Sequence, residues 1–335
     1  MKNITYCFIF CMFLFSCKEN KNGIILDEKT ESVLLSEIVD SVTYIELETV
    51  NECLIGYINN IKYINQNYYI YDNSAKTIYV FDENGKYKDK FCRYGQGYGE
   101  YLGFSTFRID NGKLHISDNI ISKILVYDMK TGAFEHGIDI DRDCPRDFLV
   151  RGNEYILFMP DKGKRQGAFV FSPESKKYKK IMDIDNWNKG LLLLNIYFIN
   201  DSTLFDNASN GVYRIKDRSI SNQYIFNFNK KYNNDTDKGY QIYSCCESGN
   251  IFAFFSAYFE GSDEQYQKMF VSLYNKRTGK VRTFDKITND IDNRKIYGDM
   301  WSLNNKIIHI IYGEEDKTGF EKNPILQILH FKDSN

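Results

Sequence analysis

The sequence predicts an all-β fold, a six-bladed β-propeller whose ring is closed by an N-terminal strand that joins the last blade. One observation is a repeated pattern of two alternating strands and a tight turn, at residues 70–85, 116–132 and 204–215. Such repeats are typical of propellers, which have about four strands and about 40–50 residues in each blade. The chain also lacks a long amphipathic helical pattern and a Gly-, Ser- or Pro-rich linker, so the repeats form one continuous domain.

Six repeat units follow one another between residues 34 and 333, which we take as the bounds of the propeller. Each unit has a hydrophobic second strand, and these strands lie 40 to 56 residues apart, near Ile70, Ile116, Ile156, Leu204, Ile251 and Ile307. Asp-Asn pairs follow three of them, at 72–73, 118–119 and 206–207. Asx side chains commonly cap the backbone after a strand, which favours turns; a polar ring facing a central channel is the alternative.

The two ends of the chain are expected to meet in the last blade. Residues 42–48 alternate between apolar and polar side chains, which is typical of a strand. The final unit offers three strands of its own, at 301–303, 306–312 and 325–331. If the early strand pairs near residues 325–331, it completes a four-stranded blade and hides two sheet edges that would otherwise stay open.

The amino terminus predicts export and lipid attachment. Lys2 precedes an apolar stretch at residues 4–15, which is too short to span a membrane and has the length of a signal-peptide core. The stretch ends in Leu14-Phe15-Ser16-Cys17, which resembles the bacterial lipobox. We expect residues 1–16 to be a lipoprotein signal peptide, Cys17 to carry the lipid, and residues 17–33 to form a polar tether. An ordinary cleaved signal with an incidental cysteine is the alternative.

Lipid on Cys17 would make the membrane a partner of the protein and place it in the cell envelope, at the outer membrane, on its periplasmic or surface face. The charge balance gives no support for a nucleic-acid partner, because 43 basic residues face 45 acidic ones. The predicted partners of the domain itself are a glycan, a peptide or another envelope protein.

Catalytic and metal-binding motifs are missing from the sequence. The 4 histidines fall in unrelated units, and no Gly-x-Ser-x-Gly nucleophile motif occurs. The cysteines that follow Cys17 lack the spacing of a zinc site; they are Cys53, Cys92, Cys144, Cys245 and Cys246. The sequence therefore predicts no metal and no cofactor, and it favours a protein that is not an enzyme.

The most distinctive segment runs from Cys92 to Tyr101 and contains three closely spaced glycines. Glycines allow positive φ and close backbone approach, while the residues between them combine charge, an amide and aromatic rings. We predict a ligand-binding loop at the mouth of the central channel, formed by Arg93, Gln96, Tyr98, Glu100 and Tyr101. The alternative is an inter-blade connection in which Arg93 and Glu100 make structural hydrogen bonds.

The same segment, preceded by Phe81-Asp82-Glu83-Asn84-Gly85-Lys86, resembles the six-bladed β-propeller lipoproteins of Bacteroidota, whose blades are NHL-like or TolB-like. The likeness runs from about residue 41 to residue 332. It departs at Tyr98, where that family usually has proline, and at Cys92. The resemblance implies the fold and export, and it carries no settled activity.

These observations leave two kinds of function open. The first is a lipid-anchored binding or interaction module for a glycan, a peptide or a partner protein. The second is a propeller hydrolase or lyase that acts on polysaccharide or peptide; two carboxylates about 5–10 Å apart at the channel mouth would favour it.

Replacement of the lipid-bearing residue tests the anchor. The variant Cys17→Ala removes the only thiol at the lipobox position, so it should release the protein from the membrane fraction and abolish incorporation of labelled fatty acid. Fractionation and metabolic labelling measure both effects. A variant that stays in the membrane and still takes up the label would show that another residue holds the lipid.

Overall fold

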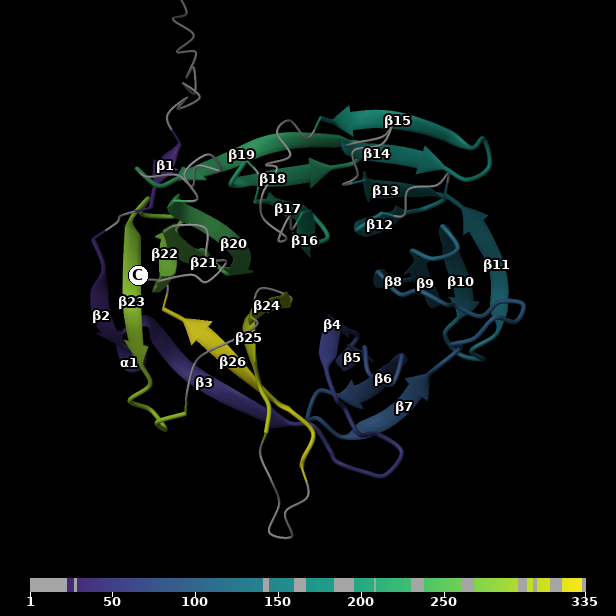
Figure 1. Ribbon diagram of the computed structural model, residues 1–335, viewed down its shortest axis with the longest axis horizontal. Helices are drawn as coiled ribbons and strands as arrows, with labels where there is room; N and C mark the ends of the chain where they lie inside the picture. The colour runs from purple at the N-terminus through teal and green to yellow at the C-terminus, as the bar shows by residue number, and fades with distance from the viewer. Residues whose placement is uncertain are drawn as a thin grey trace, which may run out of the picture.

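The computed structural model confirms a six-bladed β-propeller (Figure 1). It describes residues 23–26, 29–140, 145–159, 167–183, 196–207, 209–229, 238–260, 268–294, 300–303, 306–313 and 321–332. Six sheets stand around a common centre, and the strands that follow one another within each blade pair antiparallel. Cys17 and the whole predicted signal peptide lie outside the described residues. No helix within the described ranges is long and apolar enough to cross a membrane.

The first three blades each contain four consecutive strands, ordered from the centre outward. Blade one consists of β4 (Ile58–Ile64), β5 (Asn67–Asp72), β6 (Thr77–Asp82) and β7 (Tyr87–Phe91). Blade two consists of β8 (Thr106–Asp110), β9 (Lys113–Asp118), β10 (Lys123–Asp128) and β11 (Phe134–Asp139). Blade three consists of β12 (Asp147–Arg151), β13 (Glu154–Met159), β14 (Gly167–Ser172) and β15 (Lys177–Met182).

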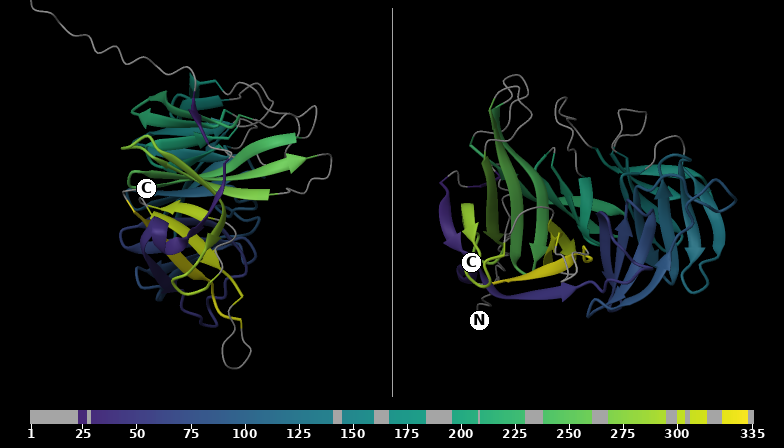
Figure 2. Two further views of the ribbon diagram at one scale, coloured as in Figure 1. Left: turned by 90° about the vertical axis from the view of Figure 1, so that its left-hand side faces the viewer. Right: turned by 60° about the horizontal axis from the view of Figure 1, so that its bottom comes forward.

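The last three blades also receive strands from the start of the chain. Blade four has β16 (Ile196–Asn200), β17 (Thr203–Asp206), β18 (Gly211–Lys216), β19 (Ser219–Asn227) and the added β1 (Ile24–Ile25). Blade five has β20 (Lys238–Ser248), β21 (Ile251–Glu260), β22 (Lys268–Asn275), β23 (Val281–Thr288) and the added β2 (Glu31–Leu34). Blade six has β24 (Met300–Leu303), β25 (Lys306–Ile311), β26 (Ile325–Phe331) and β3 (Val39–Glu46). The hairpin of β20 and β21 is the longest, and it projects beyond the ring (Figure 2).

The predicted closure of the ring is confirmed. Strand β3 pairs antiparallel with β26, from Glu46 opposite Ile325 to Val39 opposite Phe331. Asn323 joins the same ends by side-chain hydrogen bonds: its Oδ1 accepts from the Ile55 amide at 2.8 Å, and its Nδ2 donates to the Glu48 and Cys53 carbonyls at 2.8 Å. This closure hides the strand edges of the first and last parts of the chain.

The start of the chain differs from the expected polar tether at residues 17–33. Strand β1 pairs parallel with β19, and β2 pairs parallel with β23, so part of that segment belongs to blades four and five. A single helical turn, α1 (Leu35–Ile38), then leads into β3. Leu26 and Val33 are buried against the neighbouring blades, which explains why the segment stays on the propeller.

The Asp residues that end the second strands are turn residues, as the sequence favoured. The buried Asp72 carboxylate accepts hydrogen bonds from the amides of Gly56, Tyr57 and Ser74 at 2.8–3.1 Å. Asp118 does the same in blade two, for Leu102, Gly103, Ile120 and Ile121. Each carboxylate thus holds its own turn together with the connection that enters the same blade.

Loss of the Asn323 side chain should weaken ring closure. The variant Asn323→Ala leaves the Glu48 carbonyl, the buried Cys53 carbonyl and the Ile55 amide without this partner, which costs about 2–4 kcal/mol. We expect thermal unfolding to shift down by several degrees, whereas Asn73→Ala, at an exposed turn of blade one, should change it little. An equal shift in both variants would argue that Asn323 does not secure the closure.

Candidate functional site

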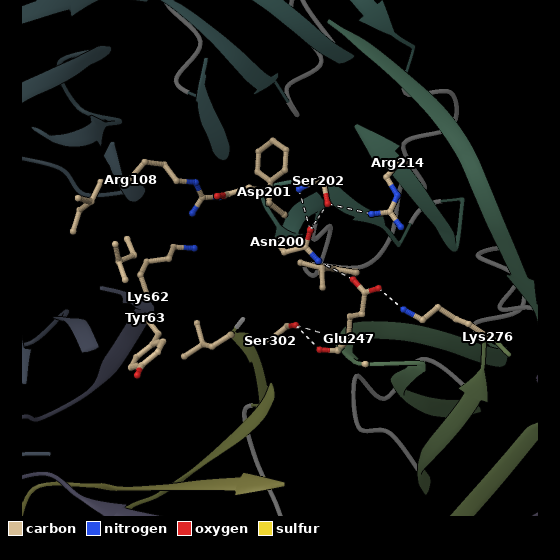
Figure 3. A pocket seen from close by; sticks show the side chains of 16 residues that line it. Lys62, Tyr63, Arg108, Asn200, Asp201, Ser202, Arg214, Glu247, Lys276 and Ser302 are labelled. Carbon is tan, nitrogen blue, oxygen red and sulfur yellow. Dashed lines mark hydrogen bonds and ion pairs between the residues drawn. The ribbon is translucent and has the colours of Figure 1, made fainter. Parts of the chain in front are cut away.

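A cavity with a volume of about 640 Å³ lies on the propeller axis (Figure 3). It is found where the inner strands turn into their second strands, and five of the six blades contribute to its wall. The lining residues are Lys62, Tyr63, Ile64, Arg108, Ile109, Phe198, Ile199, Asn200, Asp201, Ser202, Arg214, Glu247, Gly249, Lys276, Ser302 and Leu303. The axial position matches the place where strand-end loops of a propeller converge.

One side of the cavity is built around Arg108 on β8. Its Nη2 donates to Asp147 Oδ1 at 2.7 Å, and its Nε donates to the Phe148 carbonyl at 2.7 Å. The guanidinium also lies 5.4 Å from the centre of the Phe198 ring. Both members of the ion pair are buried, and the Asp147 carboxylate also accepts from the Phe198 amide at 3.2 Å. This network therefore links the inner strands of blades two, three and four.

The opposite side is built around the Glu247 carboxylate at the end of β20. Oε1 accepts from Lys276 Nζ at 2.6 Å, and Oε2 accepts from Asn200 Nδ2 at 2.7 Å. Ser302 Oγ donates to the Glu247 carbonyl at 3.1 Å and accepts from the Glu247 amide at 3.2 Å. These bonds tie blades four, five and six together, and they occupy both oxygens of a carboxylate that is almost fully buried.

Lys62 on β4 extends into the cavity between these two networks, on the side of Arg108 (Figure 3). Its ammonium group makes no hydrogen bond or ion pair to any residue that the structure describes. Desolvation in the cavity and the nearby Arg108 charge lower the pKa of Lys62 to about 7, against smaller opposing effects of Asp147 and Asp201. Lys62 is thus a cation of the cavity wall that has no hydrogen-bond or ion-pair partner among the described residues.

The glycine-rich segment lies away from this cavity, beside the outermost strand of blade two. Arg93 Nη2 donates to the Gly132 carbonyl at 3.1 Å, just before the outermost strand of blade two. The Tyr98 ring is 94% exposed and packs edge-on against Phe134, the first residue of that strand. Gln96 is exposed, and none of the predicted loop residues lines the cavity. Whether the loop binds a ligand stays a prediction.

Within that loop, two of the predicted residues have structural contacts. The Glu100 carboxylate accepts from the Gly97 amide at 2.8 Å, and it lies where a side chain at Gly95 would be, since an added Cβ would come within 2.1 Å of Oε2. Tyr101 is fully buried, and its hydroxyl donates to the Lys76 carbonyl in blade one. Glu100 and Tyr101 therefore have the structural role of the second interpretation from the sequence, in which the segment connects two blades.

Sequence reasoning missed the residues of the cavity. Lys62 and Arg108 lie 46 residues apart, at matching places in the first strands of two successive repeats. This spacing equals one repeat, and equivalent positions of the inner strands meet at the axis of a propeller. The spacing could therefore have indicated that the two side chains lie close together. Asp201 follows Arg108 after about two repeats, since no described residue of blade three lines the cavity, and Glu247 and Ser302 follow after about one repeat each, near the ends of later inner strands.

Comparison with known proteins gives a family and a fold. The family model described as "Domain of unknown function (DUF4934)" matches residues 23–334. The crystal structure of a candidate exported protein from Bacteroides fragilis is similar to this chain, with a TM-score of 0.69 and 17% sequence identity, over 92% of this chain and 99% of that chain. A duf4221 family member from Bacteroides vulgatus has a TM-score of 0.54 and 10% identity, over 88% and 97%. No curated protein matches the sequence.

The unpaired cation predicts an unusual pH dependence of stability. Because the pKa of Lys62 is lowered from 10.5 to about 7 in the folded protein, the unfolded chain binds a proton that the folded chain lacks between these values. The free energy of unfolding therefore rises with pH through this window, and the charge destabilises the fold most below it. Lys62 keeps partial contact with solvent, which screens the charge and limits the effect.

The variant Lys62→Met should raise the melting temperature by a few degrees near pH 6, and the gain should shrink toward pH 10. Thermal unfolding followed by circular dichroism across this range measures it. Lys88→Met, on the outer strand of the same blade, is the matched control and should show no such trend. A melting temperature that falls at every pH would contradict the assignment of Lys62 as a destabilising charge.

Proposed function

The chain belongs to the DUF4934 family, and we propose that it is a lipid-anchored β-propeller of the cell envelope that acts as a binding module. Its ligand would be a glycan, a peptide or a partner envelope protein. The binding site would be the axial cavity lined by Lys62, Arg108 and Glu247. The observation that carries the proposal is the convergence of charged, amide and hydroxyl side chains from five blades on one polar cavity.

The polar character of this cavity favours recognition of a hydrophilic ligand. Asn200, Ser202 and Ser302 present amide and hydroxyl groups, and Arg214 Nη1 donates to Ser202 Oγ at 3.1 Å. Hydrogen bonds between blades hold these groups in place before a ligand arrives, so little side-chain entropy is lost on binding. A rigid polar wall of this kind suits a sugar or a polar peptide segment.

Two observations support a location in the cell envelope. The N-terminal sequence has an apolar core followed by Cys17 in a lipobox-like context. The similar protein from Bacteroides fragilis is described as exported, which agrees with export of this chain. On this proposal the lipid would hold the propeller at the membrane, and the cavity would bind ligands in the periplasm or outside the cell.

The enzyme alternative, a hydrolase or lyase, finds less support in the site. None of the 4 histidines lines the cavity. The Glu247 carboxylate, which could serve as a general acid or base, is engaged by both Lys276 and Asn200. Asp201 is the other carboxylate of the wall and is exposed. These bonds favour a binding role, in which the carboxylate positions its neighbours.

A ligand screen tests the proposal. The full chain, purified in mild detergent, is screened by thermal shift against libraries of glycans and peptides. Hits are repeated with Asp201→Trp, which places a large ring in the cavity wall from an exposed turn position that tolerates the change. We expect a hit that raises the melting temperature of the parent protein and loses this effect in the variant.

Loop variants give the matched control. Arg93→Ala and Tyr98→Ala change the glycine-rich loop and leave the cavity intact, so they should bind the hit as the parent does. If these variants lose the ligand and Asp201→Trp keeps it, the loop is the site and the cavity is not. If mass spectrometry shows that the hit is cleaved, and Glu247→Gln stops the cleavage, the protein is an enzyme.

A further inference from the structure

The cavity contains more positive than negative charge, and Lys62 is the cation of its wall that has no hydrogen-bond partner among the described residues. Its wall has four cationic side chains, Lys62, Arg108, Arg214 and Lys276, and two acidic ones, Asp201 and Glu247. The buried Asp147 behind Arg108 is a third acid, so one positive charge is left over. Three of the cations have hydrogen-bond partners in the protein, whereas the Lys62 ammonium has none among the described residues.

An unpaired ammonium in such a cavity fits one anionic group. Arg108 lies on the neighbouring inner strand, and Figure 3 shows its guanidinium and the Lys62 amino group on the same side of the cavity. Arg108 is fixed by Asp147 and the Phe148 carbonyl, so it supplies a rigid positive potential beside Lys62. An anion placed at Lys62 would gain a charge-assisted hydrogen bond and would remove the repulsion between the two cations.

The remaining wall indicates what carries the anion. Asn200, Ser202 and Ser302 lie across the cavity from Lys62 (Figure 3). Ser202 donates to Asn200, and Asn200 and Ser302 both donate to Glu247. Amide and hydroxyl groups exchange hydrogen bonds readily with sugar hydroxyls. Each of these three groups has a partner in the protein and keeps further capacity, namely the second N–H of the Asn200 amide and a second lone pair on each serine hydroxyl. Sugar hydroxyls can use this capacity, whereas the aliphatic stem of an acidic peptide side chain cannot. The wall therefore favours a hydroxylated ligand with one carboxylate.

We propose that Lys62, supported by Arg108, forms a carboxylate-binding subsite for a hexuronic acid residue of an acidic polysaccharide. This inference rests on the proposed function, because it names the ligand class of the same cavity. The Lys62 ammonium donates to the carboxylate, and the sugar hydroxyls meet the wall formed by Asn200, Ser202 and Ser302.

The charge state of Lys62 makes binding depend on pH. The charged groups that face it are Arg108 on β8, Asp147 on β12 and Asp201 after β16, and the net effect of burial and Arg108 lowers its pKa to about 7. A bound carboxylate favours the protonated amine, so ligand binding raises this pKa again. Affinity should therefore be highest below neutral pH, and it should fall by up to about tenfold per pH unit above it.

Calorimetric titration of the full chain in mild detergent tests the subsite. The probes are trigalacturonic acid and its methyl ester, which keeps the rings and hydroxyls but removes the charge. We expect the acid to bind near pH 6, to bind more weakly near pH 8, and to bind at least about tenfold more tightly than the ester. Equal affinities for acid and ester would overturn the proposal.

Three variants separate charge from packing. Lys62→Met should weaken binding of the acid to the level of the ester, and Lys88→Met should leave it unchanged. Lys62→Arg keeps a positive charge at every pH, so it should bind the acid and lose the difference between pH 6 and pH 8. Full affinity in Lys62→Met would exclude the subsite, even if the variant is more stable than the parent.

The outcomes also separate this inference from the proposed function. If Asp201→Trp abolishes binding of a neutral glycan or of the ester, and the acid has no advantage, the cavity binds ligands and the carboxylate subsite is wrong. If Asp201→Trp leaves the binding of every ligand unchanged, the cavity is not the binding site and the proposed function itself fails. Tighter binding of an acidic peptide than of trigalacturonic acid would overturn the assignment to a sugar.

Discussion

The backbone pairing between β3 and β26 is the interaction on which the rest of the molecule depends. It joins residues almost 300 positions apart, and the loop that it closes contains all the other blades. Only in a closed ring does blade one stand beside blade six, so that Lys62 of β4 and Leu303 of β24 can line the same cavity. The β3–β26 pairing therefore both stabilises the chain ends and sets the geometry of the central cavity.

Within individual blades, buried carboxylates fix the inner strand relative to the second strand. Asp72 and Asp118 each bind amides of their own turn and of the connection that precedes their inner strand. The start of each inner strand is thereby fixed relative to its second strand, and the far end of that strand carries the cavity residues Lys62 and Arg108. Hydrogen bonds in the turns at one face of the ring thus help to position the cavity side chains near the opposite face.

The sequence predicts those features that depend on local patterns. Six repeats and a spare strand at residues 42–48 were enough to derive the blades and their closure, because alternation along a strand is a short-range property. Strands β1 and β2 were not predicted, since a segment of two to four residues is too short to show an alternating pattern.

The cavity was not predicted for a different reason. Single residues from five blades form it, and in the sequence each polar one looks like an ordinary polar residue of its own strand. The glycine-rich loop was recognised as distinctive, but its contacts with Gly132 and Phe134 come from a neighbouring blade that the local sequence does not reveal.

Lys62 shows how the demands of stability and of recognition oppose one another. Every other cation of the cavity wall is held by an acid, a carbonyl or a hydroxyl group, which lowers the energy of the empty site. Lys62 has no such hydrogen-bond partner among the described residues, and burial together with the neighbouring Arg108 disfavours its charged form more than Asp147 and Asp201 favour it. A methionine would fill the same space without this cost, so a purely structural explanation gives no reason for lysine at this position. A ligand that brings its own negative charge does give one, because the repulsion that destabilises the empty cavity becomes attraction once the carboxylate is bound.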